Sequence, residues 1–300
     1  MSDATARDAI GLESDRAVQS VWENWDPSGG KVYWMPGNAG AGNGFGKMLS
    51  TVGTPLHGLF VFAGEVTLIF WDAVKRLFRR PTEWRETVDQ MAFIGVASIP
   101  IVALTSFFGG AVLSLYLSQF LKEYGATTFV GATIGLTITR EIGPVLAGLM
   151  VAARCGSAMA AQIGTMAVTE QIDALKMLSV HPTNYLVIPR TIAAVTMLPI
   201  LALIGMYSGI FGGYLIAITQ GISGGTFMTS LVQFTTTDDV MSGMTKAPFF
   251  GLVIALVACQ QGLRTKNGAV GVGRATTNAV VISMVLVYVV DYVLASIMYR

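Results

Sequence analysis

Two ionisable residues and a proline stand within an apolar stretch of the sequence. Arg140 and Glu141 lie about 13 residues into the segment that begins near residue 127, roughly 20 Å along a helix. Ionisable groups at that depth in a membrane are costly unless they face protein, water or a polar ligand. Pro144 removes the helical hydrogen bond that would reach the carbonyl of Arg140. The pattern favours a polar translocation cavity lined by Arg140, Glu141 and Pro144, where Arg140 could meet a phosphate or carboxylate. The alternative is a buried ion pair with another span.

Two further charges belong to the last two apolar segments. Lys246 starts the first of these segments, and Asp291 lies near the end of the second. Because the two residues are expected at similar depth, a Lys246–Asp291 pair would satisfy both charges, and we predict a structural role for it. Asp238 and Asp239 precede Lys246 and are expected in a solvated loop.

A short polar segment, TEQIDALKM, separates two long apolar runs. At helical spacing, Ile172, Leu175 and Leu178 share one face, and charged residues occupy the others. Short amphipathic helices between spans usually dock on the membrane surface or on a protein. The net charge of this helix is near zero or negative, which disfavours anionic headgroups and favours a protein socket.

Small residues recur every fourth position in the stretch before this polar helix. Such a stripe lets another helix approach to backbone contact. The spacing does not distinguish packing within one chain from a seam between two copies. The stripe comprises Gly148, Ala152, Gly156, Ala160 and Gly164.

The composition is that of an integral membrane protein. Hydrophobic residues make up 53% of the chain and charged residues 12%, against about 25% charged residues in a typical soluble domain. Several apolar runs exceed the ~20 residues that span a bilayer. The sequence therefore predicts an all-α membrane protein with an interfacial N-terminal helix, five transmembrane helices and one polar helix between spans. The interfacial helix is expected at 55–80, where a span would submerge Glu65 and Asp72, and a true first span is the alternative. The five spans are expected at about 91–118, 127–157, 185–218, 247–263 and 276–298, and the polar helix at about 165–180. Residues 1–53 are expected to form a flexible cytoplasmic tail.

Enzyme and nucleotide-binding motifs are not found. The stretch ending in Gly46-Lys47 lacks both the first glycine and the hydroxyl residue of a phosphate-binding loop. Cys155 and Cys259 have no metal-ligand spacing, so no metal site is expected. The basic residues stand at span ends and form no basic surface, which argues against nucleic-acid binding. Their distribution places the N-terminus and the 165–180 helix in the cytoplasm and the C-terminus outside.

At these residues the chain resembles the MlaE/YrbE family of ABC-transporter permeases, which work with MCE-type lipid-binding proteins. The resemblance rests on TREIGPVLAGLMVAARCGSAMAAQIGTMAVTEQIDALKMLSVHP at 139–182, on Pro189-Arg190, and on GVGRATTNAVV at 271–281. It implies an MlaE-type permease domain over residues 54–300. Gln162 departs from the pattern, since many relatives carry Glu there, and the tail 1–53 has no counterpart.

The resemblance implies a homodimeric permease of the bacterial inner membrane, with a periplasmic C-terminus. A cytoplasmic ABC ATPase dimer would bind ATP and Mg, so this chain needs no cofactor. The subunit would move phospholipid or a similar hydrophobic lipid between membrane lipids and an MCE-domain protein. The residues that would couple to the ATPase are Glu170, Gln171, Ile172, Asp173, Ala174 and Leu175.

Two other classes of function remain open from the sequence. An ion-coupled secondary transporter of a small anionic or amphipathic substrate could use Arg140, Glu141 and Asp291. Internal repeats would favour such a transporter, and the two halves of the chain show none. The remaining class is a membrane scaffold that transports nothing.

Overall fold

The computed structural model describes residues 44–77, 84–178 and 180–298, and the regular elements within these ranges are all helical. Two compact units meet between Gly64 and Glu65, and the second unit contains every candidate span. The α-helices are α2 (Gly44–Leu77), α3 (Trp84–Ile94), α4 (Ile99–Glu123), α5 (Val130–Thr137), α6 (Gly143–Val151), α7 (Ser157–Val168), α8 (Gln171–Met177), α9 (Ile188–Thr219), α10 (Gly224–Phe234), α11 (Thr237–Leu263) and α12 (Gly268–Met298). The 3₁₀ turns are η1 (Val96–Ser98) and η2 (Thr127–Phe129), and the π-helical turns are η3 (Ile138–Ile142), η4 (Ala152–Gly156) and η5 (Thr183–Val187).

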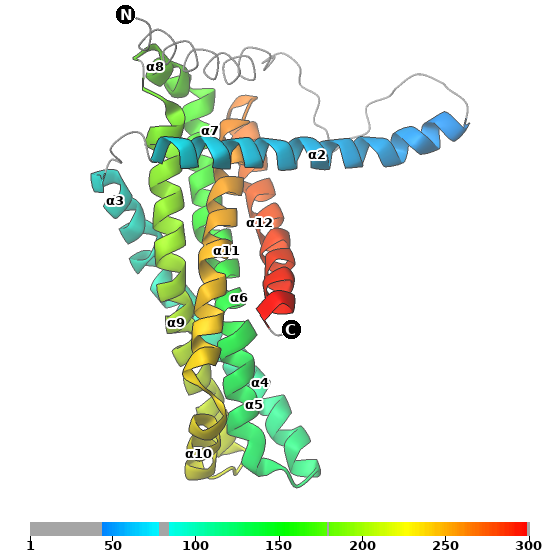
Figure 1. Cartoon of the computed structure of the whole chain (residues 1–300), viewed down its shortest axis with the longest axis vertical. Coiled ribbons are helices and arrows are strands. Elements are labelled where there is room, and N and C mark those ends of the chain that lie inside the picture. The colour runs from blue at the N-terminus through cyan, green and yellow to red at the C-terminus, as the bar shows by residue number, and fades with distance from the viewer. Residues whose placement is uncertain (1–43, 78–83, 179, 299–300) are drawn as a thin grey trace, which may run out of the picture. The chain divides into compact units, whose positions relative to one another are not determined.

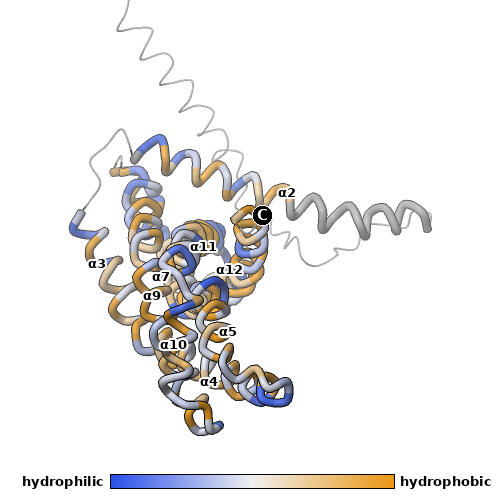
Figure 2. The backbone as a smooth tube through the Cα atoms, turned by 60° about the horizontal axis from the view of Figure 1, so that its bottom comes forward, coloured by the Kyte–Doolittle hydropathy of each residue, from blue (hydrophilic) through white to orange (hydrophobic). Residues whose placement is uncertain are grey.

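Five helical segments in the described part of the chain are long and apolar enough to cross a membrane, which confirms the predicted fold class. They are Trp84–Glu123, Thr127–Val168, Thr183–Thr219, Thr237–Leu263 and Gly268–Met298. Figure 1 shows α9 and α11 running side by side along the long axis, and Figure 2 shows apolar residues predominating along α12. Side chains facing outward from α12 are largely apolar, as lipid contact requires.

The observed spans extend beyond their predicted bounds. The second span was expected to end near residue 157 but continues to Val168, so the polar helix after it is only Gln171–Met177. The fourth span was expected from residue 247 but begins at Thr237. The segment between the third and fourth spans was predicted as a loop and contains the helix α10. Polar residues can continue a helix beyond its apolar part. Hydropathy alone therefore predicts spans that are too short.

The described part of the predicted interfacial helix is the end of α2, and residues 78–80 lie outside the described residues. In the unit that begins at Glu65, this end of α2 runs across the axes of the spans (Figure 1). Glu65 Oε2 accepts a hydrogen bond from Gln260 Nε2 at 2.7 Å and lies 3.2 Å from Arg264 Nη1. The apolar Leu68 and Trp71 are exposed. In this part of α2 the polar side chain of Glu65 therefore contacts protein, whereas the exposed side chains of Leu68 and Trp71 are apolar.

Small residues allow α4 and α9 to pack at backbone distance. A Cβ on Gly110 would overlap the carbonyl of Gly209, and a Cβ on Gly212 would overlap the carbonyl of Phe107. The hydroxyl of Ser114 donates a hydrogen bond to the Gly213 carbonyl at 2.7 Å. Small side chains and an interhelical hydrogen bond are the usual means of helix association in lipid, where the hydrophobic effect adds little.

The stripe of small residues runs through α6, η4 and α7 and packs against other segments of the chain. A Cβ on Gly148 would lie 3.3 Å from Phe250, and one on Gly156 would lie 3.4 Å from Ile254, both on α11. A Cβ on Gly164 would lie 2.8 Å from the hydroxyl of Thr265. Within the chain, this stripe therefore packs against α11 at Gly148 and Gly156 and against Thr265 at Gly164.

The first span is interrupted near Pro100. The helix stops at α3 and resumes as α4, with Pro100 in the first turn of α4. Arg154 Nη1 donates to the Phe93 carbonyl at 3.1 Å and to Ser98 Oγ at 3.0 Å. A guanidinium from the second span thus occupies a backbone acceptor at the interruption, as a broken helix in a membrane requires.

We expect Gly110→Ala to destabilise the protein, because the added methyl group overlaps the Gly209 carbonyl. Overpacking of this kind costs about 1–3 kcal/mol. Gly273→Ala in α12 is the matched control, since its Cβ meets no atom within 4 Å. The midpoint of thermal unfolding in detergent, followed with a dye that reacts with the buried Cys155 and Cys259, should fall for Gly110→Ala and stay level or rise for Gly273→Ala. An unchanged midpoint for Gly110→Ala would contradict the close α4–α9 packing.

Candidate functional site

A fully buried lysine joins three of the spans. Lys246, on α11, has no exposed side-chain surface. Its ammonium lies 2.8 Å from Glu141 Oε1, on η3, and 3.1 Å from Asp291 Oδ1, on α12. The structure therefore places Asp291 beside Lys246 and adds Glu141 as a second carboxylate. Because a buried ammonium needs compensating charge and hydrogen bonds, this cluster constrains where η3, α11 and α12 can lie.

The same lysine compensates for a hydrogen bond that proline removes. Pro144 has no N–H to give to the carbonyl of Arg140, four residues earlier. Lys246 Nζ donates to this carbonyl at 3.1 Å. The backbone around Arg140 and Glu141 forms the π-helical turn η3, which directs these neighbouring residues to different partners. Pro144 itself is buried, with Gly243 of α11 close to its ring.

Arg140 pairs with Asp239, which was predicted to lie in a solvated loop. Arg140 Nε donates to Asp239 Oδ1 at 2.6 Å, and Asp239 is buried. The other oxygen, Oδ2, accepts hydrogen bonds from the Thr236 N–H and hydroxyl, each at 2.8 Å. The solvated-loop prediction for Asp239 was therefore wrong, because Thr236 and Asp239 form a capping box that starts α11. The spacing Thr-x-x-Asp was the available signal. Asp238 is exposed, as expected.

Paired though they are, Arg140 and Glu141 both keep exposed surface. The Arg140 side chain is 41% exposed and the Glu141 side chain 38%, whereas Asp239 and Lys246 are almost fully enclosed. The structure thus has features of both sequence interpretations, ion pairing with another span and a polar surface. The cluster contains two cations and three carboxylates, and its half-exposed members can meet a charged or zwitterionic group.

The polar helix α8 lies at the opposite end of the structure from α10 (Figure 1). The three residues predicted to share an apolar face are not all buried. Ile172 is buried and Leu175 is half-buried, whereas Leu178 is exposed. The helix ends at Met177, so the pattern does not extend to Leu178. Of the residues predicted to couple, those exposed are Glu170, Gln171, Asp173 and Ala174.

Gln162, which departs from the family pattern, contacts a buried arginine. Arg190 is buried, and its Nη1 donates to the Leu186 carbonyl at 2.9 Å. Its Nη2 donates to Gln162 Oε1 at 3.3 Å. A neutral amide oxygen therefore occupies a place where a carboxylate would form an ion pair.

These features define a polytopic helical membrane protein with an intramembrane charge cluster and a polar helix exposed between two spans. The chain belongs to the MlaE permease family: the family model described as Permease MlaE matches residues 87–297. It is an ABC-transporter permease subunit and not an enzyme.

Curated relatives come from bacteria and from a chloroplast. A probable ABC transporter permease protein of Rickettsia bellii is 42% identical over 79% of this chain and 92% of its own length. A probable ABC transporter permease protein of Synechocystis is 42% identical over 72% of this chain and 82% of its own length. The Arabidopsis thaliana protein TRIGALACTOSYLDIACYLGLYCEROL 1, chloroplastic, is 36% identical over 79% of this chain and 68% of its own length.

We expect Lys246→Met to destabilise the protein strongly, because Glu141 and Asp291 lose their shared cation. Removing one member of a buried pair costs about 3–5 kcal/mol. Adding Glu141→Gln and Asp291→Asn to Lys246→Met should recover much of the loss. Thermal unfolding of the variants, followed with the same cysteine-reactive dye, measures both effects.

Lys176→Met is the matched control, because the Lys176–Asp173 pair is exposed. Such pairs contribute about 0–1 kcal/mol. Equal unfolding midpoints for Lys246→Met and Lys176→Met would contradict the structural importance of the buried cluster.

Proposed function

We propose that this permease moves phospholipid or a similar hydrophobic lipid between the bacterial inner membrane and an MCE-domain protein. It does so as a homodimer, and a separate cytoplasmic ABC ATPase dimer supplies the energy. The membership of an ABC permease family carries the proposal, because a permease of this class needs a partner ATPase. The exposed helix α8 offers that partner a surface between the second and third spans.

Two observations support a lipid as the transported substrate: the name of one relative and the exposed charges of the cluster. The name of the Arabidopsis relative contains that of a galactolipid, trigalactosyldiacylglycerol. Half-exposed Arg140 and Glu141 provide opposite charges within the apolar spans, which suits the polar headgroup of an amphipathic lipid. Pro144 contributes indirectly, by freeing the carbonyl that Lys246 binds.

The proposed orientation follows the basic residues. Lys75, Arg76 and Arg264 lie toward the end of the structure that carries α8. The positive-inside rule assigns that end to the cytoplasm. With five spans, the C-terminus is then periplasmic.

An ion-coupled mechanism is disfavoured by the way the carboxylates are held. Glu141 and Asp291 share the fully buried Lys246, and Asp239 is occupied by Arg140 and Thr236. Releasing any one of these carboxylates to carry an ion would leave a buried cation with less compensation.

Reconstitution into proteoliposomes tests the proposal. The permease together with its ATPase should transfer a fluorescent phospholipid to an MCE-domain acceptor only when ATP is present, and vanadate should stop the transfer. Ionophores that collapse proton and sodium gradients should leave the rate unchanged. Transfer that proceeds without ATP and stops with the ionophores would contradict the ABC mechanism and support ion coupling.

A further inference from the structure

A buried arginine at the α8 end of the spans lacks a carboxylate partner. Arg190, in the first turn of α9, is only 5% exposed. In the part of the chain that the structure describes, no Asp or Glu forms an ion pair with it. A buried cation is costly when no opposite charge compensates for it. The charge of Arg190 therefore calls for an anion.

Neutral acceptors satisfy only part of the Arg190 guanidinium. Its Nη1 donates to the Leu186 carbonyl at 2.9 Å. Its Nη2 donates to Gln162 Oε1 at 3.3 Å, which is longer than most N–H···O hydrogen bonds. Nε is buried and has no hydrogen-bond partner among the described residues. Because a guanidinium carries five N–H donors, donors remain for a further acceptor.

Two other arginines near this end of the spans are compensated. Arg76 Nε lies 2.7 Å from Asp72 Oδ1, and Arg264 Nη1 lies 3.2 Å from Glu65 Oε2. Arg190 is the more deeply buried of the three and has only a neutral amide, that of Gln162, in the place of such a carboxylate. Burial and missing charge thus coincide at Arg190.

Gln162 makes this place accessible from outside the protein. The residue is exposed, on the second span, and its Oε1 is directed at Arg190. Its amide nitrogen is a further donor. A phosphate group offers several strong acceptor oxygens, so one phosphate could accept hydrogen bonds from Gln162 and from Arg190 together.

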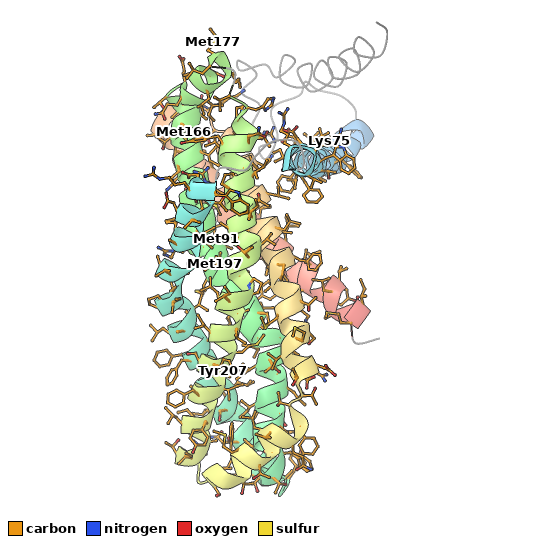
Figure 3. All side chains as sticks on the ribbon, turned by 60° about the vertical axis from the view of Figure 1, so that its left-hand side comes forward. Lys75, Met91, Met166, Met177, Met197 and Tyr207 are labelled. Carbon is orange, nitrogen blue, oxygen red and sulfur yellow. The ribbon has the colours of Figure 1, made fainter. Side chains whose placement is uncertain are left out.

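The site lies close to the level of a membrane surface. Ile163, next to Gln162, and Ile188, near Arg190, share a buried apolar cluster with Ala73 of α2. Figure 3 shows Met166, one turn from Gln162, at about the same height along the spans as Lys75 of α2.

The exposed apolar side chains of Leu68 and Trp71 put the membrane surface at the level of α2. Phospholipid headgroups, with their phosphates, lie at such a surface. The lipid phosphates nearest to the spans are therefore within reach of Gln162.

We infer that Gln162 and Arg190 bind the phosphate group of an anionic phospholipid in the leaflet beside α8, which the proposed orientation makes the cytoplasmic leaflet. An anionic headgroup is favoured over a zwitterionic one, because no carboxylate among the described residues pairs with Arg190 and could hold an ammonium beside it.

This lipid is a resident ligand and not the transported substrate. Gln162 lies roughly 30 Å from Arg140 along the second span, at 1.5 Å per residue. The two sites are thus near opposite surfaces of the membrane, and occupation of one does not require occupation of the other.

Thermal unfolding of the full-length permease tests the inference, in neutral detergent micelles that contain equal mole fractions of phosphatidylglycerol or phosphatidylcholine. Phosphatidylglycerol should raise the wild-type midpoint on the order of 3 °C above that in phosphatidylcholine. Gln162→Glu should have a higher midpoint than the wild type in phosphatidylcholine, because its carboxylate pairs with Arg190. It should gain almost nothing from phosphatidylglycerol, because the same carboxylate excludes the phosphate.

Thr169→Glu is the matched control. Thr169 is exposed and lies about two turns beyond Gln162, so this variant adds the same charge without reaching Arg190. It should respond to phosphatidylglycerol as the wild type does, which separates loss of the site from general repulsion of an anionic lipid.

Three results would overturn the inference. Equal stabilisation of Gln162→Glu and the wild type by phosphatidylglycerol would place the lipid elsewhere. A Gln162→Glu midpoint no higher than that of the wild type in phosphatidylcholine would mean that a carboxylate from another segment or chain already compensates for Arg190. Stabilisation of the wild type by inorganic phosphate, with nothing added by phosphatidylglycerol, would assign the site to a free ion. ATP-driven lipid transfer is measured separately, so each of these results leaves the proposed function standing.

Discussion

A lysine with no exposed surface needs compensating charge inside the protein, and the packing around Lys246 reflects this need. Its ammonium binds Glu141, Asp291 and the Arg140 carbonyl, which belong to η3 and α12. A shift of either segment relative to α11 would break at least one of these contacts and leave the buried ammonium with less compensation. The second, fourth and fifth spans are therefore held in one arrangement by a few polar groups, and small residues set the distances elsewhere.

Such an arrangement suits a subunit that is moved by another protein. The spans transmit displacement well when their relative positions are fixed. At one end of them, Ile172 of α8 belongs to a buried apolar cluster that also includes Ala73 of α2 and Ile188 of α9. Gln260 of α11 donates a hydrogen bond to Glu65 of α2. Polar contacts in this protein therefore hold helices together, and many of the exposed side chains on the spans are apolar.

Much of this fold follows from the sequence, because apolar runs of sufficient length have few alternatives in a membrane. The number of spans and the polar helix were predicted, but the ends were not: Thr236 and Asp239 extend the fourth span by a capping box that hydropathy does not register. The similar depth expected for Lys246 and Asp291 suggested that they pair. The pairing of Glu141 with Lys246 and of Asp239 with Arg140 could be seen only in the tertiary structure. The stripe through Gly148 indicated close packing without naming its partner helix, since small residues permit contact and do not select it.

Everything proposed for this permease requires that the α8 end face the cytoplasm and the turn at Tyr124 face the other side. Single-cysteine labelling with a membrane-impermeant maleimide measures this directly, and the native Cys155 and Cys259 are buried and give little background. In intact spheroplasts Tyr124→Cys should react and Met177→Cys should not, and in inside-out vesicles the result should reverse. Labelling of Met177→Cys from outside intact spheroplasts would contradict the account, because a cytoplasmic ATPase could then never reach α8.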